Sequence, residues 1–442
     1  MKIFFTLGVY ALFCVLLFYA NLREFNVNRS FEFWYQFIVL TAISFAYGVF
    51  SYRVLRHPET PGKKMFFLAP AFFLLVFFFM RPPWYVLDDM RIYFFHAKIF
   101  VVYNENPYAV IPADFMNDAV YVFVRDWRTQ NFNYGPLWLF ISALPVFFTK
   151  NIVAAAWMYK AISALFFIAS GWLVGRIFNN RKYAFLFALN PVVLFWGIAS
   201  GHNDIAMLFF LLASLLFLKH RLFVWSFVFL GLAALIKYTA LIALIAYIPY
   251  VFSRETSKKN AAVIFLRACV SCAFVIVVFY AFFGINSSAV SGSLGLANFG
   301  LTGPLYSFFS RYAPWVAEKT VSIGILFIGL ALIAFYRPAH DIGSLARKIT
   351  YLFIWFFLIT FWFQPWYLIW IVPFLWFASE WRAAFFATVI SWYALMYYLM
   401  FYTFSSAVGL VMTVFFFLPI FLVLRAYFSS KKGAFLAKKQ GN

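Results

Sequence analysis

Adjacent carboxylates at residues 88 and 89 are the first group in this chain that could do acid–base chemistry. Asp88 and Asp89 directly follow an apolar segment and precede the mixed stretch from Met90 to Tyr93. Partial burial and mutual repulsion would raise the pKa of one of the two carboxyls, which suits a general base. The alternative is a solvated helix start, because carboxylates are favourable near a helix N-terminus.

A second polar cluster consists of His202, Asn203 and Asp204, which follow Gly201 between two apolar segments. Such a cluster can hydrogen-bond a sugar or orient a catalytic group. Capping of the next helix by Asn203 or Asp204 is the alternative. Because capping leaves His202 unexplained, we favour a functional site here.

Lys237 lies inside an apolar segment, where ionisable residues are rare and are by default a functional hypothesis. Its expected partner is an anion, either a bound phosphate or one of the carboxylates above. The alternative is a lysine whose amine reaches the outer membrane surface while its stem stays in the apolar layer.

Aromatic and amide side chains are further candidates. Gln364, Trp366 and Tyr367 lie around a proline between two apolar segments, and Tyr134 lies in a turn-forming aromatic stretch. Trp and Tyr are enriched at both membrane surfaces in any case. Gln364 beside a helix-breaking proline is therefore the more informative residue of this group.

The elements that must position these residues are membrane helices. Of the 442 residues, 66% are hydrophobic and 11% are charged, whereas a soluble domain is about 45–50% apolar and roughly 25% charged. Lipid must therefore be the solvent for most of the surface, and we predict an all-α polytopic membrane protein of about 13–14 transmembrane helices. The net charge of +21 is explained by Lys and Arg in cytoplasmic loops, so nucleic-acid binding is not expected.

The basic residues also predict the topology. Lys and Arg gather in four loops, at 53–64, 176–182, 219–221 and 254–259, and such loops face the cytoplasm. Three apolar segments lie between the first two loops, so one of them must not cross the membrane. We expect that segment, 136–149, to be an amphipathic or re-entrant helix at the outer face. By the same logic, 222–252 crosses outward and returns near Lys237, and both termini are cytoplasmic.

This topology divides the chain into three expected parts. Residues 1–64 form two N-terminal transmembrane helices, and 65–380 form a catalytic membrane core with a large outer loop at 81–151. Residues 381–442 form C-terminal transmembrane helices and a basic cytoplasmic tail. Every polar cluster named above then falls on the non-cytoplasmic side, although only basic residues were used to derive the topology.

The order of these motifs resembles the GT-C superfamily of membrane glycosyltransferases. The residues that carry the resemblance are Asp89 with Tyr93, then 106–108, 134–137, 190–191, 201–204, Lys237 and 364–367. Within that superfamily, the pattern is similar to bacterial polyprenyl-phosphate-mannose-dependent α-mannosyltransferases. The similarity covers 65–380 and implies a GT-C-like bundle whose first outer loop contains amphipathic helices.

The resemblance also implies an activity: inverting transfer of one sugar, mannose or another hexose, from a polyprenyl-phosphate sugar to a lipid-linked or cell-envelope glycan. Asp89 fits the spacing of the family's aspartate base, and Asp88 could substitute for it. Lys237 and Arg91 would bind the donor phosphate. The residues expected to contact the sugar or the acceptor are His202, Asn203, Asp204, Tyr93, Tyr134, Gln364, Trp366 and Tyr367.

The same resemblance places the enzyme in a bacterial inner membrane, with its active site on the periplasmic face. No cofactor and no metal are expected, although the doubled aspartates leave room for a divalent cation. Two other readings stay open. A lipid-linked-sugar flippase or secondary transporter would line a pathway with the same charges, and a glycan polymerase or ligase would use an arginine-rich outer loop, for which Arg81, Arg91, Arg125 and Arg128 are available.

Overall fold

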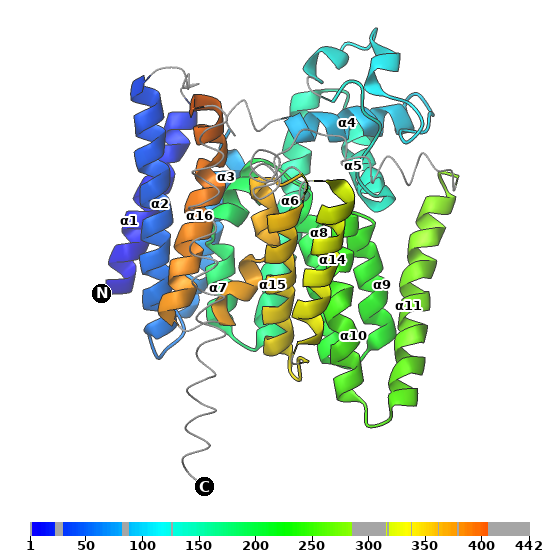
Figure 1. Ribbon diagram of the computed structural model, residues 1–442. Coiled ribbons are helices and arrows are strands. Elements are labelled where there is room, and N and C mark those ends of the chain that lie inside the picture. The colour runs from blue at the N-terminus through cyan, green and yellow to red at the C-terminus, as the bar shows by residue number, and fades with distance from the viewer. Residues whose placement is uncertain are drawn as a thin grey trace.

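The structure is a computed structural model that describes residues 2–22, 30–81, 88–124, 127–284, 315, 318–336, 338–360, 362–377 and 380–404. Within these ranges every regular element is a helix and no strand occurs, so the prediction of an all-α membrane protein is confirmed. Most helices run roughly parallel and form a bundle, and α4 lies across one end of it (Figure 1). The helices and tail predicted beyond residue 404 lie outside the described residues.

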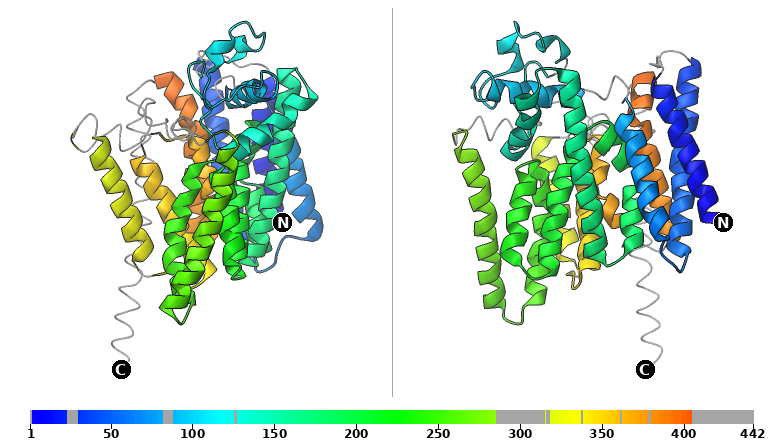
Figure 2. Two further views of the ribbon diagram at one scale, coloured as in Figure 1. Left: turned by 90° about the vertical axis from the view of Figure 1, so that its right-hand side faces the viewer. Right: turned by 180° about the vertical axis from the view of Figure 1, so that it is seen from behind.

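Three N-terminal helices stand at one edge of the bundle: α1 (Lys2–Leu22), α2 (Ser30–Arg56) and α3 (Lys63–Phe79). Helix α16 (Glu380–Phe404) packs against α2, as the views in Figures 1 and 2 agree. The hydroxyls of Tyr10 and Tyr47 donate to the carbonyls of Leu189 and Leu186, at 2.8 and 2.6 Å. The N-terminal helices therefore brace a segment that leads directly to the polar cluster at 202–204.

A cap of short elements covers one end of the bundle (Figure 2). It contains α4 (Asp88–Val101), the 3-10 turns η2 (Pro112–Phe115) and η3 (Tyr121–Phe123), and α5 (Pro136–Phe148). With 13 residues, α5 is about 20 Å long, which is shorter than the hydrocarbon core of a bilayer at about 30 Å. This length agrees with the predicted non-spanning helix at the outer face.

The next part of the bundle is built from five helices, of which α11 stands at its edge (Figure 1). They are α6 (Ile152–Phe178), α8 (Asp204–Lys219), α9 (Phe223–Ala234), α10 (Ile242–Arg254) and α11 (Lys258–Ala281). Helix α8 packs against both α6 and α9, and α9 packs against α11. The break between α9 and α10 at Lys237 confirms the prediction that 222–252 is two short helices.

A bent pair of helices precedes α8. Helix α7 (Arg181–Ala188) and the π-helical turn η4 (Val193–Ala199) meet at an angle of 60°. Asn190 lies at the break and its side-chain oxygen accepts from the amides of Val192 and Val193, at 2.9 and 3.3 Å. Turns of π-helix inside helices are frequently found at functional sites.

The C-terminal part contributes α14 (Lys319–Phe335) and α15 (Ile342–Ile359), which pack together. Two 3-10 segments follow, η7 (Pro365–Trp370) and η8 (Val372–Phe377). Residues 200–204, 235–237 and 364–370 are therefore interruptions between helices rather than parts of continuous spans. At membrane depth such irregular backbone is tolerated only where it is buried in protein or lines a cavity.

Five of the described helices are long and apolar enough to cross a membrane, or six if the bent pair α7–η4 is one span. They are Ile3–Ala20, Glu32–Arg56, Ile152–Phe178, Lys258–Ala281 and Ile342–Ile359. Shorter apolar helices, including Phe223–Ala234 and Thr320–Phe335, accompany them. The total of about 13–14 spans stays a prediction.

Three lysines stabilise the ends of neighbouring helices. Lys160 on α6 donates to the carbonyls of Phe78 and Met80 at the end of α3, at 3.0 and 2.7 Å. Lys219 and Lys348 bond in the same way to terminal carbonyls of α6 and α14. The last carbonyls of a helix have no partner within the helix, and a cation is favourable at that end.

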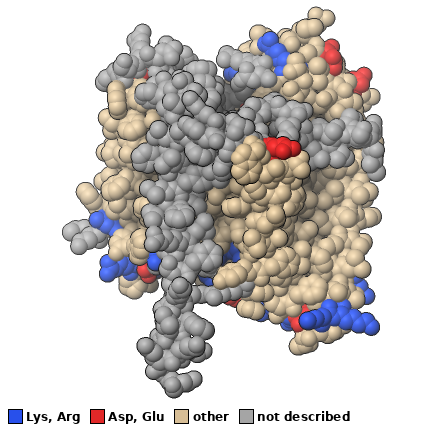
Figure 3. Space-filling view, viewed as in Figure 1, with Lys and Arg blue, Asp and Glu red and all other residues tan. Residues whose placement is uncertain are grey.

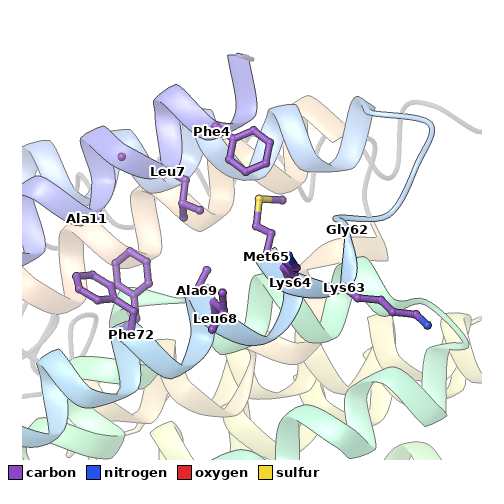
Figure 4. Close-up of a pocket in the computed structure, with 12 residues that line it drawn as sticks. Phe4, Leu7, Ala11, Gly62, Lys63, Lys64, Met65, Leu68, Ala69 and Phe72 are labelled. Atoms are coloured by element: carbon purple, nitrogen blue, oxygen red, sulfur yellow. The ribbon is translucent and has the colours of Figure 1, made fainter.

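Charge is unevenly distributed over the surface. On the face shown in Figure 3, Lys and Arg lie mostly at the end opposite α4, across a broad uncharged band. An apolar cleft of about 830 Å³ lies between α1 and α3 (Figure 4) and is lined by residues such as Phe4, Leu7, Leu68 and Phe72. None of the candidate site residues lines it, so this cleft is distinct from the polar clusters.

Candidate active site

Asp89 is the centre of the first group of polar contacts. Its Oδ2 accepts from the hydroxyl of Tyr93, one turn later on α4, at 3.3 Å, and from the hydroxyl of Tyr134 at 3.2 Å. Nδ1 of His202 lies 3.0 Å from the same oxygen. The structure thus brings together residues from the cap and from the break before α8.

The surroundings of Asp89 favour its ionised form. Burial by itself raises the pKa of the Asp89 carboxyl, but the interactions with His202, Lys237 and Tyr134 outweigh burial and hold that pKa below its usual value. The carboxyl is therefore an anion at neutral pH. An ionised carboxylate accepts hydrogen bonds and donates none.

A buried ion pair forms the second group. Nζ of Lys237 lies 2.9 and 2.7 Å from the two carboxylate oxygens of Asp204, and the indole N–H of Trp370 donates to Oδ1 of Asp204 at 2.6 Å. The rings of Tyr367 and Tyr134 face the ammonium, with centroids at 4.7 and 5.5 Å. Of the two anions expected for Lys237, the carboxylate is present as Asp204.

Tyr134 connects the two groups, because its hydroxyl bonds to Asp89 while its ring faces Lys237. Gly135 holds it in place: the amide of Gly135 donates to the carbonyl of Ile236 at 3.1 Å. A Cβ at Gly135 would lie 2.1 Å from the carbonyl oxygen of Leu235. Only glycine allows this close approach, which joins the turn before α5 to the break that carries Lys237.

Residues 106–108 also contact Tyr134, through its backbone. The side-chain oxygen of Asn106 accepts from the amide of Tyr108 at 3.0 Å, and its amide nitrogen donates to the carbonyl of Phe283, also at 3.0 Å. The hydroxyl of Tyr108 donates to the carbonyl of Tyr134 at 2.9 Å. Residues 106–108, which are part of the family resemblance, therefore hold the backbone of Tyr134 in position.

Aromatic rings enclose the polar atoms. The indole of Trp366 stacks on the imidazole of His202 with centroids 4.0 Å apart and an interplanar angle of 17°. Trp196 contacts both rings, at 5.6 Å from His202 and 5.4 Å from Trp366. Tyr367 stacks on Trp370 at 4.6 Å. These rings exclude water, which strengthens the electrostatic interactions between the buried charges.

Several buried polar atoms in this site have no hydrogen-bond partner among the residues that the structure describes. They are Nε2 of His202 and both side-chain polar atoms of Asn203, and each residue is 1% exposed. A buried polar atom without a hydrogen bond costs about 1–3 kcal/mol. Such atoms call for an explanation, and a ligand rich in hydroxyls, such as a sugar, would satisfy both donors and acceptors.

The remaining predicted residues are placed as follows. Gln364 is buried, 4% exposed, at the start of η7 beside Trp366. Arg91 is half-buried on α4, but residues two apart on a helix do not face the same way, so it does not point with Asp89. The side chain of Asp88 lies outside the described residues. No group of three or more His, Cys, Asp or Glu that would suit a metal occurs in the described part of the chain.

Two carboxylates of the loop between α4 and α5 make local contacts. Asp118 pairs with Nζ of Lys98 and the hydroxyl of Tyr103, both at 2.5 Å, and Asp114 accepts from the amide of Ile111 at 2.9 Å. Asp114 is exposed and Asp118 is half-buried.

Sequence reasoning also missed Trp370 and Trp196. Trp370 bonds to Asp204 and Trp196 lies against His202, but in a chain with 16 tryptophans neither position differs from an ordinary membrane aromatic. The available signal was proximity: Trp370 lies one helical turn beyond Trp366, and Trp196 lies six residues before His202.

The fold and the site together define a class, that of polytopic membrane proteins with a polar site at the broken ends of their helices beneath a cap of short elements. Within that class, residues 79–253 match the family described as alpha-(1->6)-mannopyranosyltransferase, N-terminal domain. Alpha-(1->6)-mannopyranosyltransferase A of Corynebacterium glutamicum is 29% identical over 126 residues, which are 27% of this chain and 26% of that protein. No solved structure matches the chain.

These matches support a GT-C mannosyltransferase-like protein, as the motifs predicted. The chain spans about a quarter of the length of the curated relative. The family match contains Asp89, Tyr134, His202, Asp204 and Lys237. The aromatic residues of η7 lie beyond its end.

Proposed function

We propose that this protein is an inverting mannosyltransferase that uses a polyprenyl-phosphate sugar as its donor. The observation that carries the proposal is the convergence of an Asp89–His202 pair and an Asp204–Lys237 pair on the two sides of Tyr134. A glycosyl transfer needs a proton acceptor on one side of the anomeric carbon and a cation for the departing phosphate on the other. The two pairs supply these groups within one buried site.

In the proposed reaction, the acceptor hydroxyl loses its proton to the Asp89–His202 pair while its oxygen attacks the anomeric carbon. The bond from that carbon to the phosphate oxygen breaks, and its electrons remain on the lipid phosphate. Proton transfer by a positioned base contributes about 10²–10⁴-fold to a rate. Attack from the face opposite the phosphate inverts the anomeric configuration.

Lys237 is proposed to stabilise the charge that develops on the lipid phosphate. Two of its three N–H donors are directed at Asp204 in the structure, and an ammonium has three. The third N–H donor would be directed at the departing phosphate. Preorganised cations in a water-excluded site act more strongly than they would in water.

The sugar and acceptor are proposed to occupy the space bounded by Asn203, His202 and Trp366. Unpaired amide and imidazole atoms would bind hydroxyl groups there, and Gln364 and Tyr367 lie on the same broken segment. Aromatic rings such as Trp366 provide an apolar surface for the less polar face of a hexose. Mannose is proposed from the family match; the acceptor is proposed to be a lipid-linked or cell-envelope glycan.

The orientation in the membrane is proposed from charge. Lys and Arg lie mostly at the end of the bundle opposite α4 (Figure 3), and such residues are enriched on the cytoplasmic side. The site beneath α4 would then face the periplasm of a bacterial inner membrane, with both termini cytoplasmic. A lipid-phosphate sugar that reaches this face needs no nucleotide.

The proposal is tested with purified protein in liposomes that contain radiolabelled polyprenyl-phosphate mannose and a lipid-linked glycan acceptor. We expect the acceptor to gain one mannose with inverted anomeric configuration, and we expect no product when nucleotide-linked mannose replaces the lipid donor. Movement of the labelled lipid across the bilayer without any new glycosidic bond would instead identify a transporter and contradict the proposal.

A further inference from the structure

The two ring nitrogens of His202 have opposite surroundings. Nδ1 lies 3.0 Å from Oδ2 of Asp89, whereas Nε2 is buried without a partner. Because an ionised carboxylate can only accept, the hydrogen of a neutral imidazole must be on Nδ1. The lone pair of the ring is then on Nε2. His202 is therefore held with its basic atom unoccupied.

In contrast, one carboxylate oxygen of Asp89 already has three hydrogen-bonding neighbours. The hydroxyls of Tyr93 and Tyr134 and Nδ1 of His202 all lie within 3.3 Å of Oδ2. Hydrogen bonds to a carboxylate stabilise its charged form and make it a weaker base. The arrangement suits a carboxylate that orients an imidazole and stabilises its protonated form better than one that itself takes a proton.

We infer that Nε2 of His202 is the atom that receives the proton of the acceptor hydroxyl, and that Asp89 acts as the residue that orients and stabilises this histidine. The inference rests on the proposed function and assigns the proton within it. The O–H bond of the acceptor breaks as the new C–O bond forms, and the proton goes to Nε2. Imidazolium forms against Asp89 and returns its proton to solvent after the lipid phosphate has left.

The neighbours of His202 fix the position of this base. Trp366 lies parallel to the ring at 4.0 Å, so the imidazole cannot turn without losing that contact. Asn203 follows directly and carries two further unpaired polar atoms, which would hold the acceptor near Nε2. The titratable and charged groups that surround the imidazole are Asp89 and Tyr93 on α4, Tyr134 before α5, Asp204 on α8 and Lys237 before η5.

The test is the pH dependence of kcat/KM for mannose transfer by the full-length protein in liposomes. The two bases are distinguished by which substitution removes the acidic limb of the profile. We expect His202→Gln to lower kcat by about 10²–10⁴-fold, to retain binding of polyprenyl-phosphate mannose, and to lose this limb.

Asp89→Asn gives the complementary result. Without the carboxylate the imidazolium is less stable, so the limb should remain in the residual activity and move to lower pH. His96→Gln is the matched control, because His96 is also a buried histidine of the cap and its ring packs on Phe132. We expect its limb to coincide with that of the wild type.

If His202→Gln is active and the acidic limb of its pH profile is unchanged, the inference is overturned. Asp89 would then be the group that receives the proton. If His202→Gln does not fold, Asp89→Asn still decides, because loss of the limb together with the carboxylate would overturn the inference as well. These outcomes differ from failure of the proposed function, in which wild-type protein would transfer no mannose at any pH.

Discussion

The ammonium of Lys237 lies within 3 Å of both carboxylate oxygens of Asp204, at 2.9 and 2.7 Å. Asp204 is fully buried and Lys237 is 8% exposed, so each charge is balanced by the other in a site with little water. Removal of one partner from a buried pair leaves an uncompensated charge, which costs about 3–5 kcal/mol. The pair therefore stabilises the fold, and Lys237 within it is also the proposed phosphate-binding cation.

These two roles separate in a double variant. We expect Lys237→Met and Asp204→Asn each to lower the midpoint of thermal unfolding strongly, whereas the combined variant recovers much of the loss because neither charge remains. Mannose transfer should stay absent in the double variant, since no cation faces the leaving phosphate. Unfolding midpoints in detergent and transfer rates in liposomes check this, and a double variant that transfers at the wild-type rate would rule out a role for Lys237.

Gly135 should be intolerant of a side chain. In Gly135→Ala the new Cβ would lie 2.1 Å from the carbonyl oxygen of Leu235, so the turn and the Lys237 break must move apart. Overpacking of this kind costs about 1–3 kcal/mol, and Tyr134 would shift relative to Asp89. We expect at least about a tenfold loss of transfer, in line with the sensitivity of reactions to misplaced groups.

Gly324→Ala is the control for this substitution. Among the described residues, no atom lies within 4 Å of a Cβ at Gly324, and alanine is favoured over glycine in a helix by about 1 kcal/mol. Unfolding midpoint and transfer should be preserved or slightly improved. Equal losses of transfer in both glycine variants would show that the close approach of Gly135 to Leu235 has no special importance.

The sequence predicted the site better than it predicted the contacts within the site. Asp89, His202, Asp204 and Lys237 could be found because charged and polar residues are rare in apolar segments. Their pairing could not be found, because it depends on how three helix interruptions meet. Asp204 was expected to contact a sugar, whereas in the structure both of its oxygens accept from Lys237.

The fold, too, was predicted in part from the sequence. The split of 222–252 and the short helix at 136–148 followed from positive charges and length. The π-helical turn at 193–199 did not, because the Asn190-Pro191 pair indicates a break but not its geometry. That geometry depends on the helices that brace it, through bonds such as those of Tyr10 and Tyr47.

Lys160 should contribute to stability rather than to catalysis. Its amine bonds to two carbonyls at the end of α3, and replacement by methionine would leave these acceptors unpaired at about 1–3 kcal/mol. We expect Lys160→Met to lower the unfolding midpoint and to leave the KM for the lipid donor unchanged. The exposed Lys150 provides the control, and the account of helix capping is wrong if Lys150→Met is equally destabilising.

His96 should make the outer cap sensitive to acid. Burial lowers the pKa of His96 to about 3, whereas an unfolded histidine titrates near 6.5. Between these values the unfolded chain binds a proton that the folded chain does not, so stability falls as the pH decreases from about 6.5 toward 3. The slope is about 1.4 kcal/mol per pH unit for one group.

His96→Gln removes this contribution. Unfolding midpoints recorded from pH 7 to pH 4 should fall less steeply in the variant than in the wild type. Parallel curves for the two proteins would show that His96 already takes up its proton in the folded state.

The central claim, mannose transfer that depends on Asp89, is tested most directly by one comparison. The initial rate of transfer from polyprenyl-phosphate mannose is measured for wild type, Asp88→Asn, Asp89→Asn and Glu105→Gln, the last being an exposed carboxylate of the same outer loop. We predict that Asp89→Asn loses about 10²–10⁴-fold and that Glu105→Gln matches the wild type. Normal transfer by both Asp88→Asn and Asp89→Asn would contradict the account.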